Sequence, residues 1–228
     1  DQRSASGTRQ CPLNRRLLIG GYTMISLENV AAADVATQPF KYFVARSVLQ
    51  PSALAAVRRD FPPINGPGVF PLNELTYGPA FSSLIDDIRS QDFEDVIAEK
   101  LDIDLSDKPL MITVRGYCQK KDGRIHNDST DKVVTCLLYL NEAWSEDGGR
   151  LRLLRNDHDL DDTIAEVPPN GGTLVVFRRS SNSWHGHYPF EGQRRYIMFN
   201  WVRSEQALRW NLGRHALSAR LKRLNPFK

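Results

Sequence analysis

PLMITVRGY, residues 109–117, marks a change in the pattern of the chain that determines its architecture. Before Pro109, apolar residues recur at helical spacing; after it, they alternate at a spacing of two, which is typical of strands. Short apolar segments follow, separated by turns such as Asp147-Gly148-Gly149 and Pro169-Asn170-Gly171-Gly172. The pattern predicts strands over residues 110–117, 133–140, 150–154, 173–177 and 194–202.

The first half of the chain is predicted to be mainly helical. A short strand at 39–44 leads into helices at 52–60, 81–88 and 93–101. Helices followed by a run of strands favour an α+β, mainly β fold, in which N-terminal helices buttress a double-stranded β-helix of the jelly-roll or cupin type. Residues 204–224 predict a C-terminal amphipathic helix, which we expect to dock through Leu208, Leu212, Leu217 and Leu221 with its arginines facing solvent.

Length and composition indicate an ordinary globular protein. The chain has 228 residues, 41% hydrophobic and 25% charged, enough for one buried core. We expect a flexible tail at residues 1–14 and a single domain at 15–228, with the jelly-roll core at about 110–203. The net charge of +3 does not argue for nucleic acid. The three cysteines lack CxxC spacing and no apolar run is long enough for a membrane span, so we expect a cytoplasmic protein.

Two histidines and an aspartate near the predicted strands have the pattern of metal ligands. His126 and Asp128 precede the strand expected at 133–140, and His185 precedes the strand expected at 194–202. Brought together on facing strands, they would form the 2-His-1-carboxylate set, which leaves positions of a non-haem Fe(II) open for a co-substrate and O2. The sequence therefore predicts an iron site made of these three residues.

Such a metal site needs an anion-binding residue nearby, because a chelating 2-oxo acid brings a second carboxylate into a water-poor barrel. Arginine stays charged and binds a carboxylate through two parallel hydrogen bonds. Arg194 and Arg195 are adjacent in the last predicted strand. Alternation puts Arg195 on the more apolar face, which we expect to point into the barrel, and Arg194 on the surface.

Several motifs between about residues 110 and 203 occur in a characteristic order. Tyr117 stands nine residues before His126, TCLLYLN occupies 135–141 ahead of Trp144 and Gly148-Gly149, GTLVVF occupies 172–177, Pro189 follows His185 by four residues, and Trp201 follows Arg195 by six. This set resembles the iron(II)/2-oxoglutarate-dependent dioxygenases, in particular the prolyl-4-hydroxylase-like branch that includes the hypoxia-factor prolyl hydroxylases. The helices before residue 110 match that family only loosely.

The resemblance implies a chemistry and roles for individual residues. The predicted triad would bind Fe(II), Arg195 and Tyr139 would hold the distal carboxylate of 2-oxoglutarate, and Tyr117 would line the co-substrate or the substrate side. Reaction with O2 would release succinate and CO2 and hydroxylate a substrate, with ascorbate as an auxiliary reductant. Because Asp128 fills the carboxylate position, hydroxylation is favoured over halogenation.

The choice between the two histidines of His185-Gly186-His187 is not settled by alternation, because both side chains lie on one side of an extended strand and Gly186 permits a bend. The family spacing to Pro189 favours His185 as the ligand. We therefore place His187 on the substrate side. The other residues expected to shape substrate choice are Arg115, Gln119, Lys120, Arg124, Asn182 and Trp184.

The substrate expected from the resemblance is a peptide, peptidyl proline included, or a small molecule such as an amino acid; nucleic acid is not expected, and the oligomeric state stays open. Fold alone does not imply function. One alternative is a cupin-like metal- or sugar-binding module without turnover, and another is a non-oxidative metalloenzyme such as an isomerase. The acidic loop around His158 favours a solvated turn over a second metal site.

Overall fold

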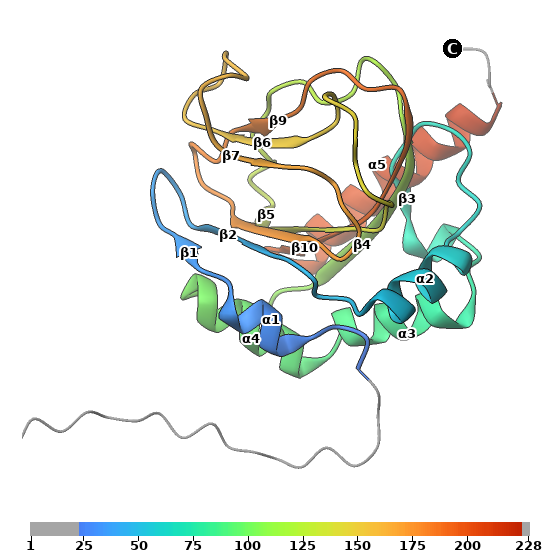
Figure 1. The fold of residues 1–228 in the computed structure, drawn as a ribbon, viewed down its shortest axis with the longest axis horizontal. Helices are drawn as coiled ribbons and strands as arrows, with labels where there is room; N and C mark the ends of the chain where they lie inside the picture. Colours follow the sequence, from blue (N-terminus) through green and yellow to red (C-terminus); the bar gives the residue numbers. More distant parts are fainter. Residues whose placement is uncertain (1–22, 225–228) are drawn as a thin grey trace, which may run out of the picture.

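The computed structural model describes residues 23–224, with the backbone alone for residues 215–216 and 218–224. The predicted tail at residues 1–14 lies outside these residues. Two antiparallel sheets face each other (Figure 1): a seven-stranded sheet of order β1-β2-β8-β5-β10-β4-β3 and a three-stranded sheet of order β7-β6-β9. The strands are β1 (Val35–Ala36), β2 (Tyr42–Ala45), β3 (Phe70–Pro71), β4 (Leu110–Cys118), β5 (Lys132–Tyr139), β6 (Leu151–Leu154), β7 (Thr163–Val167), β8 (Leu174–Arg178), β9 (His185–Gly186) and β10 (Gly192–Val202).

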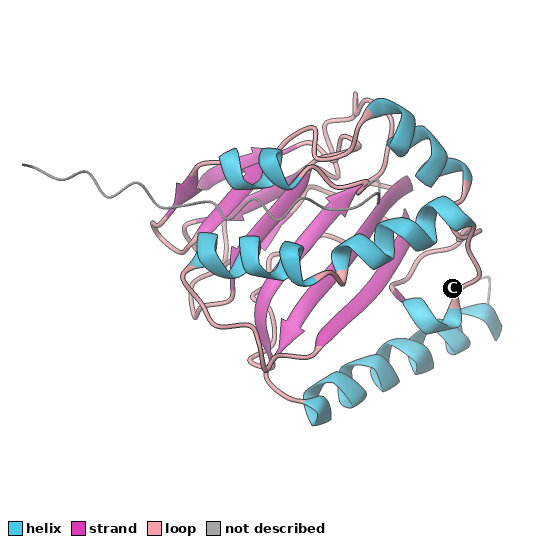
Figure 2. Ribbon diagram, turned by 90° about the horizontal axis from the view of Figure 1, so that it is seen from below, coloured by secondary structure: helices cyan, strands magenta, loops and turns pink. Residues whose placement is uncertain are grey.

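Four helices lie beneath the larger sheet, and one long helix runs beside its edge (Figures 1 and 2). They are α1 (Leu27–Ala32), α2 (Pro51–Arg59), α3 (Pro79–Ile88), α4 (Gln91–Leu101) and α5 (Glu205–Leu224), with a short 3-10 turn at Leu72–Glu74. The predicted mainly β fold with helical support, a double-stranded β-helix, is confirmed. The predicted elements match the observed ones to within about three residues at each end; α1 and the strands β1, β3, β7 and β9 were not predicted.

The helices begin and end at residues whose chemistry favours these positions. Proline occupies the first turn of α2 and of α3, where its missing N–H costs nothing. The Ser90 side chain caps α4 by accepting a hydrogen bond from the backbone N–H of Phe93 at 3.2 Å. The helix ends at Asp102, which adopts a left-handed conformation (φ 49°).

The main apolar core lies between the helices and the larger sheet. Phe93 of α4 packs on Phe199 of β10, with ring centroids 5.8 Å apart, and the indole N–H of Trp201 donates to the Glu94 carboxylate at 2.9 Å. Ile197 belongs to the same buried cluster. The most apolar face of β10 therefore points toward the helices.

A second buried cluster fills the space between the two sheets. It contains Tyr139, Leu153, Val175 and Phe177. On β10, Tyr196 and Met198 pack against this cluster, because they alternate with the residues that face the helices. The interior of the barrel is thus lined by the more polar face of β10.

Helix α5 packs against the edge of the larger sheet over its first turns. Ala207, Leu208 and Leu212 contact Met111 and Val202. The predicted contact of Leu217 is wrong, because its side chain is 61% exposed, and the side chain of Leu221 is not among those described. Arg209 and Arg214 are exposed as expected. No helix within residues 23–224 is both long enough and apolar enough to cross a membrane.

Candidate metal centre and co-substrate pocket

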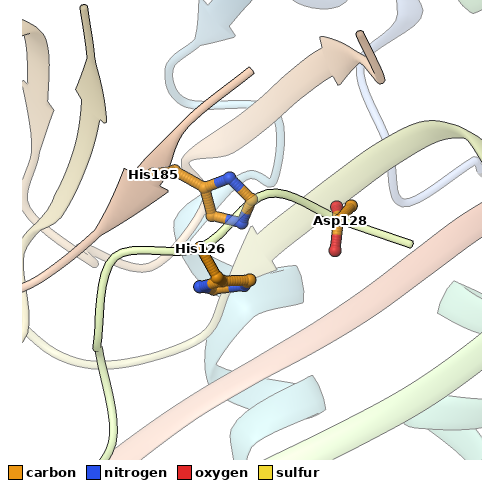
Figure 3. Close-up of side chains that lie close together, drawn as sticks. All are labelled: His126, Asp128 and His185. Carbon is orange, nitrogen blue, oxygen red and sulfur yellow. The ribbon is translucent and has the colours of Figure 1, made fainter. Parts of the chain in front are cut away.

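The structure brings together the three predicted metal ligands. His126 lies before β5 and His185 opens β9, and the two residues exchange backbone N–H···O hydrogen bonds of 3.0 Å in each direction. Their rings are 4.2 Å apart between centroids. Asp128 lies to the side of both rings (Figure 3), and one ligand atom from each residue lies within 4.8 Å of the others. Among the described residues this is the one cluster of histidine, cysteine and acidic side chains placed to hold a metal ion.

Both imidazoles are oriented by the backbone. The Nδ1 atom of His126 lies 2.9 Å from the carbonyl oxygen of Arg124, and that of His185 lies 3.0 Å from the carbonyl oxygen of Ser183. A carbonyl can only accept, so each Nδ1 carries the proton and each Nε2 keeps a lone pair for a metal. Burial lowers the pKa of His185 to about 4, so its ring is neutral at pH 7.

Asp128 is a buried carboxylate with a partner at each oxygen. The ammonium of Lys132 donates to Oδ1 at 2.7 Å, and the hydroxyl of Thr135 donates to Oδ2 at 2.6 Å. Burial opposes the charged form, but Lys132, His185 and the two hydrogen bonds outweigh it and hold the pKa of Asp128 well below its usual value. Two imidazoles and an ionised carboxylate fit the facial triad of non-haem iron.

The triad opens into a cavity of about 270 Å³ between the two sheets. Leu137, Leu151 and Met198 form an apolar part of its wall, and Arg194 and Arg115 bring positive charge to it. A small, mostly apolar cavity with a few convergent polar groups is typical of a site for a small molecule. Its full lining is Val69, Arg115, Asp122, Gly123, His126, Asp128, Lys132, Thr135, Leu137, Leu151, His185, Gly186, His187, Arg194, Tyr196 and Met198.

Arg194, and not Arg195, is the arginine of β10 that points into this cavity. Its side chain is 2% exposed. The guanidinium donates through Nε to the carbonyl of Gly149 at 2.8 Å and through Nη2 to the hydroxyl of Tyr139 at 3.3 Å. It also lies over the ring of Tyr196, 5.0 Å from the centroid. Among the described residues, no acidic side chain forms an ion pair with Arg194.

The prediction that Arg195 faces the barrel interior is therefore wrong. Arg195 is half-buried on the other face of β10, over the ring of Phe61 at 5.2 Å and beside a separate hollow lined by Arg58 and Trp144. The physical reason is the helix layer. Because helices cover the outside of the larger sheet, the more apolar face of β10 packs against them, and alternation puts Arg194 inside.

The two predicted tyrosines lie outside the cavity wall. Tyr139 is fully buried behind Arg194, and burial raises its pKa to about 12, so it keeps its hydroxyl proton. Tyr117 is half-buried and pairs with Pro67 in an isolated parallel bridge. The geometry therefore gives Tyr139 a contact with the arginine of the pocket and gives Tyr117 no place on its wall.

The predicted substrate-side residues divide into two groups. Arg115 and His187 line the cavity, and Arg115 donates to the Asp122 carboxylate at 2.7 Å. Burial lowers the pKa of His187 to about 4, and its Nδ1 lies 2.8 Å from the carbonyl of Tyr188, so the neutral ring keeps Nε2 as an acceptor. Trp184 and Arg124 lie off the cavity wall, and so do Gln119, Lys120 and Asn182.

Sequence reasoning missed Lys132, Thr135 and Asp122 as parts of the site. Lys132 stands at the start of a strand, where a lysine is usually solvated, and no pattern indicates that its ammonium turns inward. Thr135 lies in a motif that the resemblance covers, and its place two residues before Leu137 on the inner face was the available signal. Asp122 lies in a loop whose path no periodicity predicts.

The acidic loop around His158 has no arrangement suited to a metal. His158 is exposed and contacts Asp157 through Nδ1 at 2.9 Å. Asp161 and Asp162 accept hydrogen bonds from Arg152 and Arg155, both at 2.8 Å. These ion pairs satisfy the acidic side chains within the loop, in agreement with the solvated turn.

Comparisons with known proteins agree with this geometry. A sequence profile described as the 2OG-Fe(II) oxygenase superfamily, which names both 2-oxoglutarate and Fe(II), matches residues 112–203. A search among curated proteins found no match. Among solved structures, a prolyl-4-hydroxylase of Pseudomonas putida is similar, with 21% identity and a TM-score of 0.50 over 78% of this chain and 91% of that chain.

HygX of Streptomyces hygroscopicus, solved with nickel and 2-oxoglutarate bound, is 14% identical, with a TM-score of 0.51 over 72% of this chain and 82% of that chain. At these identities the likeness of the solved structures shows the shared fold. The span of the profile match contains the whole triad and Arg194. Residues 112–203 of this chain, which include the candidate metal centre, match the profile of the 2OG-Fe(II) oxygenase superfamily.

Proposed function

We propose that this protein hydroxylates a small molecule or a peptide, with 2-oxoglutarate as co-substrate and release of succinate and CO2. The Nε2 atoms of His126 and His185 and the carboxylate of Asp128 would hold Fe(II). The bound metal would supply the activation of O2 that oxidises both 2-oxoglutarate and the substrate. The chain's own part is to fix the three ligands on one side and leave the other positions open.

The buried, unpaired guanidinium of Arg194 is the observation that carries this proposal. A buried charge without a partner costs several kcal/mol, and among the described residues the groups that accept hydrogen bonds from Arg194 are neutral: the backbone carbonyl of Gly149 and the hydroxyl of Tyr139. A carboxylate that enters the cavity would complete the missing pair. The distal carboxylate of 2-oxoglutarate fits this role, because its keto acid end would then face the triad in the same cavity.

Tyr139 supports this site by positioning Arg194. Because Nη2 of Arg194 donates to the hydroxyl oxygen of Tyr139, the hydroxyl proton of Tyr139 is free to point elsewhere. The ring of Tyr139 also lies beneath the guanidinium, 5.3 Å from its carbon. These contacts hold the guanidinium in one orientation, which lowers the ordering cost of binding a carboxylate.

On the substrate side, Arg115 and His187 are the residues that the cavity favours. The free Nε2 of His187 is an acceptor, and the guanidinium of Arg115 is a donor held by Asp122. A substrate with an amide or a hydroxyl and a neighbouring carbonyl would match both. This pair supports a peptide or an amino acid derivative.

The cytoplasm is the compartment that we propose, because Cys118 and Cys136 are buried free thiols in keeping with a reducing environment. The alternative of a cupin-like module without turnover has no observation in its favour, because mere metal or sugar binding gives no reason for a buried arginine without a carboxylate beside the triad.

Substrate-stimulated succinate formation tests the proposal. The full chain, supplied with Fe(II), 2-oxoglutarate, O2 and ascorbate, should form succinate, and a panel of peptides and amino acids should raise the rate for the correct class. Asp128→Ala should abolish succinate formation. Wild-type protein that binds metal yet forms no succinate with any member of the panel, not even at a slow background rate, would contradict the proposed reaction.

A further inference from the structure

Both oxygens of the metal-binding carboxylate are held by protein donors. Lys132 donates to Oδ1 of Asp128 and Thr135 donates to Oδ2. The two donors come from β5, the strand that follows Asp128. Lys132 is only 8% exposed, so its ammonium lies inside this buried site and is not a solvated surface charge.

The direction of each hydrogen bond in this cluster is determined. An ionised carboxylate only accepts, so the hydroxyl of Thr135 must donate its single proton to Asp128. The same hydroxyl oxygen then accepts from the side-chain amide of Asn200 at 2.8 Å. Asn200 is fully buried on β10. The carboxylate is thus fixed from two strands.

We infer that Lys132 is a positioning residue that keeps Asp128 a ligand through a single oxygen and tunes the charge of the site toward 2-oxoglutarate. This inference rests on the proposed function. Carboxylates bind metals through one oxygen or through two. A donor on each oxygen favours the first mode, which leaves one more position of the metal for the chelating co-substrate.

The positive charge of Lys132 also favours the binding of 2-oxoglutarate. Its ammonium repels a divalent cation at the triad and attracts the dianion of 2-oxoglutarate, which enters the cavity that Lys132 lines. Loss of the ammonium should therefore affect the two ligands in opposite ways: the metal should bind as tightly as before or more tightly, whereas 2-oxoglutarate should bind less tightly. A lysine that merely supported the fold would weaken both when removed.

Titration calorimetry of the full chain tests this inference, with Mn(II) as the metal because it does not turn over. In Lys132→Met, which keeps the length and removes the charge, 2-oxoglutarate should bind the Mn(II)-loaded protein about tenfold or more weakly. The Mn(II) affinity should be unchanged or higher. Lys132→Arg restores a charged donor and should recover 2-oxoglutarate binding to within about threefold of the wild type.

Lys120→Met is the matched control, because Lys120 is an exposed lysine in the loop before the triad, and it should change neither affinity. A parallel loss of both affinities in Lys132→Met, or an unchanged 2-oxoglutarate affinity, would overturn the inference. A Lys132→Arg variant as defective as Lys132→Met would overturn it as well. If the wild-type protein binds Mn(II) but does not bind 2-oxoglutarate, the proposed function itself is contradicted.

Discussion

At the scale of single residues, the proposed metal ligands are oriented by contacts that do not need the metal. Backbone carbonyls hold the Nδ1 atoms of His126 and His185, and Lys132 and Thr135 hold Asp128. For the two imidazoles, this preorganisation reduces the ordering cost of binding a metal. The assembly of the triad was predictable from residue type and spacing. The place of Lys132 was not, because strand periodicity does not say which way a long side chain turns at a strand end.

Substitutions of His185, in β9, and of His187, just after β9, should have different effects on metal content. His185 lies beside His126 and Asp128, whereas His187 lies on the cavity wall with its Nδ1 bonded to Tyr188. Metal content measured after Fe(II) loading should collapse in His185→Ala and survive in His187→Ala. Iron retained in His185→Ala and lost in His187→Ala would show that the ligand is the other histidine.

At the scale of elements, β10 explains both the fold and the misplaced arginine. Its two faces are both buried, one against the helices and one between the sheets. Alternation correctly divided its residues into two sets, with Arg195 beside Ile197, Phe199 and Trp201. It could not say which set faces the barrel, because that depends on where the helices pack, and the interior of an oxygenase barrel must accept polar ligands.

The helix-facing side of β10 should carry much of the stability. Phe199 is fully buried between Phe93 and Trp201, so Phe199→Ala should lower the free energy of unfolding by about 3 to 5 kcal/mol. Leu217→Ala on α5 is the control, because Leu217 is exposed, and should change it by about 0.5 kcal/mol or less. Urea unfolding followed by circular dichroism measures both. Equal losses of unfolding free energy in Phe199→Ala and Leu217→Ala would mean that α5 is packed more tightly than the structure shows.

At the scale of the whole molecule, the division into a layer of helices and a strand-rich second half follows from the change of period at residue 109, and this much was predictable; the order of the strands in the sheets was not. The strands that were missed are short or lie at edges: β7 is only half-buried over most of its length, and β9 has two residues. Such strands depend on their partners, which no local pattern reveals. The path of the chain from Gln119 to Asp128 was unpredictable as well, because this segment is a loop without periodicity.

The basic residues of α5 should not bind anionic polymers. Arg209 and Arg214 are exposed, but the net charge of the chain is only +3, and a solvated basic face is the simplest explanation. Binding of the full chain to duplex DNA and to vesicles with anionic lipid, measured at low and at physiological salt, should be negligible at physiological salt. Strong binding that salt weakens steeply would contradict this view.

The affinity of the Mn(II)-loaded protein for 2-oxoglutarate, compared between Arg194→Gln and Arg195→Gln, tests the organisation of the site most directly. Arg194→Gln should weaken binding by about a hundredfold or more, because losing a buried charged partner costs about 3 to 5 kcal/mol. Arg195→Gln should leave the affinity within about twofold of the wild type, because Arg195 packs on Phe61 on the opposite face of β10 and exposed contacts contribute little. Mn(II) affinity should be unchanged in both variants. A larger loss in Arg195→Gln than in Arg194→Gln would show that the arginine of the co-substrate pocket, and the register of β10 with it, is wrongly assigned.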